Sequence, residues 1–323
     1  MRDDEQDTYY CSAYAGQMAE FVRFKRAQGL KYRCETGRLR ELSRFLADHH
    51  APADQATVDR WCALRPHEQP GTQRLRISAA RQFFGWLAAR GEAAALPTPT
   101  RRRNPKTFVP YVFTHGEIGR FFAAADQAKA RTPSVMATVA PVLFRLLYGC
   151  GLRIGEALNL DLGDVDLVAG CLTVRHAKYD QDRLVPMSAT LAEVMRAHAR
   201  RRPTGGSRDT GRFFVHRDGR PISPDVAYTW FRTVLWSAGI SYQGRGHGPR
   251  MHDLRHTFAV HALKAMTDDG TDVHCALPVL STYLGHSTLA ATGQYVRLTQ
   301  DLFPDVIAKT NPISAYVIPG DLP

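Results

Sequence analysis

Six residues in the last two thirds of the chain have the side chains needed to cut and rejoin a phosphodiester without a metal. They are Arg153, Lys178, His252, Arg255, His286 and Tyr295. Each arginine can offer a fork of N–H donors to the non-bridging oxygens of a phosphate and offset the charge of a pentacovalent transition state. The lysine and histidines can transfer protons, and the tyrosine hydroxyl can attack phosphorus. Together they predict phosphoryl transfer through a covalent tyrosyl intermediate.

Each of these residues taken alone also has a structural explanation. Arg153 follows a glycine turn, where arginines often bind carboxylates or carbonyls, and Glu156 is a partner that could orient it toward a phosphate. Lys178 alone is an ordinary surface lysine, and any one of 12 tyrosines is usually a core aromatic. The prediction depends on the whole set.

The histidine-rich segment allows two interpretations. His252 and Arg255 are three residues apart and share one face of a helix, which suits proton transfer beside a bound phosphate. His252, His256 and His261 could instead converge on a metal, but the glutamate that follows the first histidine of a zincin helix is Asp253 here. We therefore expect no metal or other cofactor, and structural roles for His256 and His261.

Tyr295 lies nine residues after His286, so the two side chains would point apart on one unbroken helix. Gly285 predicts the end of a helix just before His286, and Gly293 allows a second change of direction. These breaks would let both side chains reach one site.

Composition indicates a polyanionic partner. The 323 residues include 42 Lys and Arg against 31 Asp and Glu, which gives a net charge of +11 and a pI near 9.6. Nucleic acid is the leading candidate. A membrane surface is the alternative, but the sequence has no long apolar run and begins with the acidic segment MRDDEQDTYY. We expect a soluble, cytoplasmic protein whose six scattered cysteines are small buried residues in a reducing compartment.

Apolar spacings of three and four predict a helical, DNA-binding domain over residues 1–92. Its last helix, 72–89, carries Arg74, Arg76 and Arg81, which we place on one side as DNA contacts, with a solvated face as the alternative. Residues 93–112 form a basic, proline-containing linker with four further expected DNA contacts, Arg101, Arg102, Arg103 and Lys106.

Residues 113–323 are predicted to form a catalytic domain with a C-terminal tail. Thr114 and Glu117 match a capping box, and an apolar helix over 137–148 precedes the glycine turn before Arg153. The segments 171–175 and 183–187 predict a small antiparallel hairpin with Lys178 in its loop. The fold class is therefore mainly α with a small antiparallel sheet.

Three motifs in order resemble the tyrosine recombinases, or phage integrases. They are LYGCGLRIGEAL at 147–158, HDLRHTF at 252–258, and LGH at 284–286 followed by Tyr295. The segment RLVPM at 183–187 is similar to the strand that follows the family's hairpin lysine, which places that lysine at Lys178. The N-terminal module resembles the family's core-binding, SAM-like domain.

The resemblance implies a mechanism and an assembly. Tyr295 would form a 3′-phosphotyrosyl bond, His252 would assist as base, and Lys178 would protonate the departing 5′-oxygen. Strands would be exchanged at specific double-stranded DNA sites within a homotetramer, with no metal or nucleotide. Accessory directionality factors, and passage of a C-terminal segment to a neighbouring subunit, are further expectations from the family.

One departure from the family pattern is a longer stretch between Arg255 and His286, and we expect residues 267–275 to form a surface loop. This departure favours an integrase of a mobile element over a housekeeping enzyme. Two other functions stay open: a type IB topoisomerase-like enzyme, and a catalytically silent DNA-binding regulator of the same fold. A metal-dependent nuclease is the weakest alternative, which activity in EDTA would dismiss.

Overall fold

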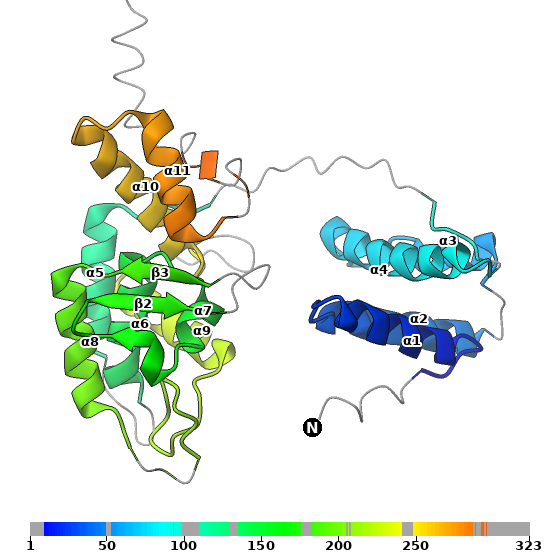
Figure 1. The fold of residues 1–323 in the computed structure, drawn as a ribbon, viewed down its shortest axis with the longest axis horizontal. Coiled ribbons are helices and arrows are strands. Elements are labelled where there is room, and N and C mark those ends of the chain that lie inside the picture. Colours follow the sequence, from blue (N-terminus) through cyan, green and yellow to red (C-terminus); the bar gives the residue numbers. More distant parts are fainter. Residues whose placement is uncertain are drawn as a thin grey trace, which may run out of the picture. The chain divides into compact units, whose positions relative to one another are not determined.

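The computed structural model describes residues 10–49, 53–92, 94–98, 110–128, 135–175, 182–204, 206, 208–240, 248–286, 288, 292–293 and 295. The chain divides into two compact units, Met1–Phe108 and Val109–Pro323, each with its own core (Figure 1). Five predicted site residues lie outside the described residues: the catalytic Lys178 and the DNA contacts Arg101, Arg102, Arg103 and Lys106. No helix of the described chain is both long and apolar enough to cross a membrane.

All the regular elements described in unit 1 are helices. Its helices are α1 (Ala15–Ala27), α2 (Arg33–Asp48), α3 (Gln55–Cys62) and α4 (Pro70–Ala89). Aromatic packing holds them together, with the rings of Phe21 on α1 and Phe83 on α4 centred 5.7 Å apart. Asp54 begins α3 by accepting a hydrogen bond from the backbone N–H of Thr57.

Arg76 corrects the prediction that three arginines of α4 share one exposed side. Arg76 is 2% exposed and forms a fork with Glu68, at 3.0 Å from Nε and 2.7 Å from Nη2. It also donates to the carbonyl of Ala63. Arg74 and Arg81 are both exposed. They are seven residues apart, which places them on the same face of the helix, whereas Arg76 is two residues from Arg74 and lies on the opposite face. Arg76 is therefore a core arginine.

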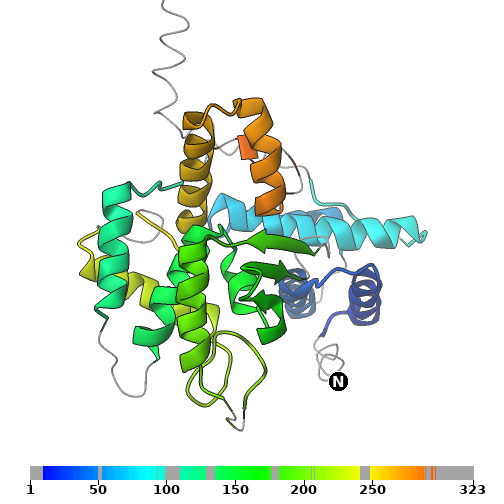
Figure 2. The ribbon, with the colours of Figure 1, turned by 60° about the vertical axis from the view of Figure 1, so that its left-hand side comes forward.

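Unit 2 is mainly helical with one small sheet. Its elements are α5 (His115–Asp126), α6 (Met136–Gly149), α7 (Ile154–Leu158), η2 (Leu162–Asp164), β1 (Val165–Asp166), β2 (Cys171–Val174), β3 (Arg183–Pro186), α8 (Ala189–Arg201), α9 (Pro224–Ser237), α10 (Asp253–Asp268) and α11 (Val273–Leu284). The antiparallel order is β1-β2-β3, with Cys171 opposite Pro186. Helices α10 and α11 lie side by side (Figures 1 and 2).

Several sequence predictions for unit 2 are confirmed. The capping box at Thr114 begins α5, and β2 pairs with β3 as the predicted hairpin. Helix α6 is buried along most of its length and ends at the glycine turn, where Gly151 has a φ of +58°. Gly285 ends α11 in the left-handed conformation, as its position before His286 predicted.

Other predictions for this unit are wrong. Most of the expected loop at 267–275 is helical, since α10 continues to Asp268 and α11 begins at Val273. Only 269–272 connect them, and Asp272 caps α11 by accepting from the N–H of His274. Strand β1 was not predicted. Of the six cysteines, Cys62 and Cys150 are buried, while Cys11, Cys34 and Cys275 are exposed.

Candidate active site

The glycine turn after α6 places Arg153 at the start of α7. Its backbone N–H donates to Oε2 of Glu156 at 2.9 Å, and its Nη1 donates to Oε1 of the same carboxylate at 2.7 Å. Nη2 donates to the carbonyl of Gly285, at the end of α11, at 3.3 Å. The predicted pairing of Arg153 with Glu156 is therefore present, and it fixes the guanidinium between α7 and α11.

Arg183, the first residue of β3, is a second partner of Glu156. Its Nη1 and Nη2 donate to the two carboxylate oxygens at 3.1 and 2.8 Å, and its Nε donates to the carbonyl of Tyr283 at 3.1 Å. Burial would raise the pKa of Glu156, but the hydrogen bonds from Arg183 and from the backbone of Arg153 outweigh it and lower the pKa to about 2. Glu156 is therefore ionised and held on both sides.

Arg255 is buried, at 1% exposure, in the first turns of α10. Its Nη1 donates to the carbonyl of Gly151 at 2.6 Å and its Nη2 to the carbonyl of Leu284 at 2.8 Å. Nη1 also lies 3.9 Å from Oε2 of Glu156. Burial, followed by the nearby charge of Arg153, lowers the pKa of Arg255 to about 10. Arg255 thus links α10 to the turn after α6 and to the end of α11.

Two glycines leave space for side chains packed at the site, Arg183 beside Gly285 and Phe258 beside Gly151. A Cβ on Gly285 would lie 2.9 Å from Nη1 and 3.0 Å from Cζ of Arg183. A Cβ on Gly151 would lie 2.5 Å from the ring of Phe258. Both residues also have positive φ, of +67° and +58°, which disfavours any residue with a side chain. Close packing and backbone conformation therefore both require glycine here.

Three histidines around the arginines have lowered pKa values, each of about 4. For each ring the main cause is burial, because the charged form loses hydration, and neighbouring positive groups add to it. His252 directly precedes α10 and keeps an exposed surface, and its ring meets that of His256 edge-on with centroids 4.7 Å apart. His286 is the third. All are neutral at pH 7, so each has a nitrogen that can accept a proton.

Tyr295 is 1% exposed and lies among these histidines. Its hydroxyl is hydrogen-bonded to Nδ1 of His256 at 3.0 Å. Its ring stacks on that of His286, with centroids 6.1 Å apart and an interplanar angle of 24°. Nδ1 of His286 is in turn 2.7 Å from the hydroxyl of Thr292. The end of α11 at Gly285 lets Tyr295 lie beside His286, as the sequence predicted. Gly293 is itself helical, so the second predicted break is not at this residue.

The structure brings together five of the six predicted catalytic residues, Arg153, His252, Arg255, His286 and Tyr295, with Glu156 beside them. It adds two residues that the sequence reasoning did not assign to the site. Arg183 was predicted only as part of a strand. A charged residue at the end of this strand was a signal that could have identified it as a site residue. His256 was expected to be structural, yet it is the histidine that contacts the tyrosine hydroxyl.

The fold is that of DNA recombinases. A solved structure of the XerH site-specific recombinase bound to palindromic difH substrate superimposes with a TM-score of 0.63 at 17% identity, over 85% of this chain and 78% of that one. A lambda integrase dimer bound to a core site gives a TM-score of 0.60 at 17% identity, over 87% and 76%.

The sequence places the chain within a family. Residues 112–301 match the model of the phage integrase family. The chain is 30% identical to "Putative integrase/recombinase y4rB" of Sinorhizobium fredii over 92% of this chain and 97% of that protein. It is 32% identical to tyrosine recombinase XerD of Neisseria meningitidis over 72% and 74%. The chain belongs to the phage integrase family and is a tyrosine recombinase, an enzyme of site-specific recombination.

Proposed function

We propose that the chain cuts and rejoins DNA through a 3′-phosphotyrosyl intermediate on Tyr295. The observation that carries this proposal is the position of the Tyr295 hydroxyl, hydrogen-bonded to a neutral His256 at 3.0 Å within a cluster of cationic and imidazole side chains. A phenol needs a proton acceptor to attack phosphorus, and His256 and His252 are the neutral bases at hand.

Arg153 and Arg255 are the proposed phosphate ligands. Both guanidiniums already lie beside the Glu156 carboxylate and donate to carbonyls at the end of α11, so their spacing is set before DNA arrives. Such preorganised donors stabilise a pentacovalent phosphorane more than the ground-state phosphodiester, because its charge is larger. Glu156 and Arg183 act as positioning residues that hold the two arginines in place.

The proposed reaction has two balanced steps. The Tyr295 oxygen bonds to phosphorus and loses its proton to a histidine, while the bond from phosphorus to the 5′-oxygen breaks and Lys178 supplies a proton to that oxygen. A 5′-hydroxyl then attacks the phosphotyrosyl bond, which restores the phosphodiester and the phenol. The ester keeps the energy of the broken bond, so this chemistry needs no nucleotide cofactor.

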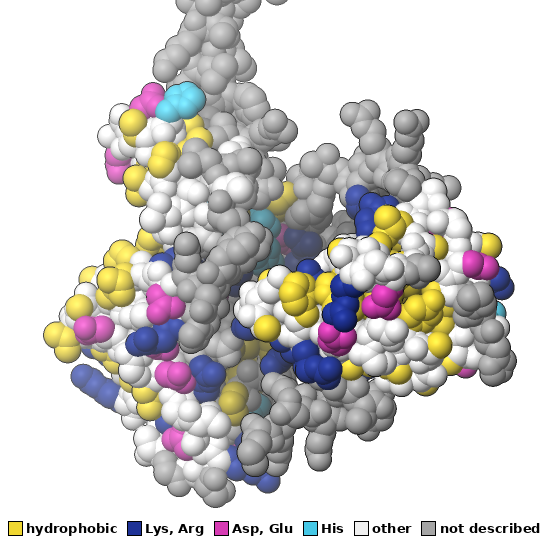
Figure 3. All heavy atoms as spheres, turned by 45° about the vertical axis from the view of Figure 1, so that its right-hand side comes forward, with side chains coloured by type: hydrophobic (Ala, Val, Ile, Leu, Met, Phe, Trp, Pro, Cys, Tyr) yellow, Lys and Arg dark blue, Asp and Glu magenta, His cyan; other side chains and the backbone are white. Residues whose placement is uncertain are grey.

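DNA binding is proposed for both units. The chain carries a net charge of +11, and Figure 3 shows Lys and Arg side chains on the visible surface of each unit. Exposed Arg74 and Arg81 stay proposed contacts, and so do the four cations of the linker at 93–112, with 1–92 as the core-binding domain and 113–323 as the catalytic domain. The integrase-named relative supports integration or excision of a mobile element. Strand exchange is proposed to take place within a homotetramer on DNA.

The test is capture of the covalent intermediate. Full-length chain is incubated in EDTA with nicked duplexes from the DNA that flanks its gene, and SDS-resistant adducts are measured. We expect an adduct with the wild type and none with Tyr295→Phe. Tyr283→Phe is the matched control, because Tyr283 is a nearby tyrosine whose hydroxyl donates to the carbonyl of Pro186 instead of facing the histidines. Tight, specific binding without any adduct would instead support a silent DNA-binding regulator.

A further inference from the structure

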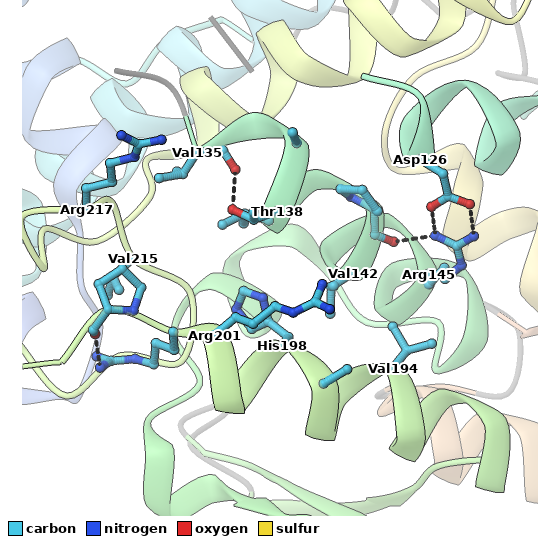
Figure 4. Close-up of a pocket in the computed structure, with 16 residues that line it drawn as sticks. Asp126, Val135, Thr138, Val142, Arg145, Val194, His198, Arg201, Val215 and Arg217 are labelled. Atoms are coloured by element: carbon cyan, nitrogen blue, oxygen red, sulfur yellow. Dashed lines mark hydrogen bonds and ion pairs between the residues drawn. The ribbon is translucent and has the colours of Figure 1, made fainter. Parts of the chain in front are cut away.

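A cavity of about 520 Å³ lies in unit 2 between the first half of α6 and the second half of α8 (Figure 4). Its volume is in the range of small-molecule sites, roughly 300–1,000 Å³. Aliphatic side chains form much of its wall, among them Val139, Val142 and Val194. The candidate active site shares no lining residue with it.

The wall is strongly positive. It contains four arginines and one aspartate. Two of the arginines are already paired: Arg145 makes a fork with Asp126 at 2.7 Å for each bond, and Arg202 makes one with Asp209 at 2.6 and 3.1 Å. The other two, Arg201 and Arg217, have no ion pair or hydrogen bond with any described residue, and both are exposed toward solvent.

One further group at the cavity wall, the imidazole of His198, has unsatisfied hydrogen-bonding capacity among the described residues. His198 is only 6% exposed, and its Nε2 has no hydrogen-bond partner among the described residues. It lies three residues before Arg201 on α8, so both side chains are on one helix face. The first turn of α6 also lines the cavity, but the N–H groups of Thr138 and Val139 in that turn already donate to the carbonyl of Val135.

We propose that this cavity binds a small organic anion, with its carboxylate or phosphate against Arg201, Arg217 and His198 and an aliphatic body against the valines. Two guanidiniums without a partner among the described residues and a buried imidazole nitrogen line the same cavity, and a few polar groups in an otherwise apolar pocket are the usual means of orienting a ligand. No Phe, Tyr or Trp is among the described residues that line the cavity, so it has no platform for a nucleotide base.

The test uses the full chain without DNA, so its outcome is independent of strand cleavage. Isothermal titration calorimetry is run with octanoate and with octyl phosphate, which distinguish a carboxylate from a phosphate ligand. Octanol lacks the charge, and acetate and inorganic phosphate lack the apolar body. We expect saturable binding at one site per chain for at least one charged octyl probe, and weaker binding for all three comparison compounds.

Three variants make the test specific to the cavity. Arg201→Gln and Arg217→Gln should each weaken the best probe at least about tenfold, because each removes a charged hydrogen bond. Arg200→Gln is the matched control, since Arg200 is an exposed neighbour on α8 that does not line the cavity, and its affinity should stay at the wild-type value. Ala197→Leu should weaken binding by filling the cavity.

Two results would overturn the proposal. One is the absence of saturable binding for both octyl probes with chain that melts cooperatively. The other is an equal loss of affinity in Arg200→Gln and Arg201→Gln, which would indicate attraction to a generally basic surface. Equal affinity for inorganic phosphate and octyl phosphate would also contradict the apolar half of the site.

Discussion

At the scale of single residues, the candidate site depends on how one carboxylate is shared. Glu156 accepts from Arg153 and Arg183, and Arg255 lies 3.9 Å away. Replacing Arg183 with Gln removes charged hydrogen bonds worth about 1.5–3 kcal/mol. We expect single-turnover cleavage of a nicked duplex to slow by roughly 10- to 100-fold, with DNA affinity nearly unchanged, because Arg183 is proposed to act through Glu156.

Arg175→Gln is the control for this variant. Arg175 also forms an ion pair next to the sheet, with Asp164 at 2.5 Å. Its side chain is half-exposed, and the carboxylate that it pairs with is not that of Glu156. Cleavage by this variant should match the wild type. If both variants slow cleavage equally, or if Arg183→Gln lowers DNA affinity instead, then Arg183 does not position the site.

The buried histidines predict how stability depends on pH. His256 has a pKa of about 4 in the folded chain against 6.5 for the free side chain. Between these values the unfolded chain binds more protons, so the free energy of unfolding falls as the pH drops from 6.5 toward 4. In His256→Gln this fall should be shallower, as measured by urea unfolding at several pH values. His274→Gln, an exposed histidine of α11, should keep the wild-type slope.

Residue types and order were enough to predict which residues gather in the candidate site, because Arg153, the 252–255 pair and Tyr295 lie in recognisable local motifs. Partners across the fold were not predictable in this way. Arg183 meets Glu156 over 27 positions of sequence, and His256 meets Tyr295 over 39. Arg76 was misplaced for a related reason, since nothing local to α4 shows that Glu68 will fold back onto it.

At the scale of elements, the end of α11 sets the position of several site residues. In Gly285→Ala the left-handed backbone costs about 1–2 kcal/mol, and the new Cβ meets the Arg183 guanidinium at 2.9 Å. We expect a lower melting temperature and slower DNA cleavage. Gly270→Ala separates the two effects, because Gly270 has a φ of +87° but open space around its Cβ position. It should lose stability and keep its cleavage rate.

Elements with strong end signals were predicted well, as the capping box of α5 and the glycine end of α11 illustrate. Strand β1 has only two residues, too few for an alternating pattern, and pairing with β2 creates it. The segment at 267–275 looked like a loop because it is rich in Asp and Gly. Asp272 instead caps the start of α11, which is a common use of this residue. Asp268 lies in the last turn of α10 and pairs with Lys264.

At the scale of the whole molecule, the net charge of +11 predicts DNA binding that weakens steeply with salt. Arg74→Gln and Arg81→Gln should each reduce the slope of log affinity against log salt by about one and leave the melting temperature nearly unchanged. Arg76→Gln should do the reverse: it should unfold unit 1 more readily, since it leaves Glu68 without its partner in the core. Fluorescence anisotropy with a labelled duplex and thermal melting would check both outcomes.

The sharing of Glu156 also affects the stability of the protein when it is not bound to DNA. Three guanidiniums face a single carboxylate, so this cluster carries a net positive charge. Burial is the main cause of the lowered pKa of Arg255, and the charge of Arg153 adds to it. A DNA phosphate would supply the missing negative charge. Because a ligand that binds only the folded state stabilises it, unit 2 should resist heat and proteolysis best while it is on its substrate. Molecules that have left DNA would then be the first to unfold and be degraded, which would limit the pool of unengaged enzyme.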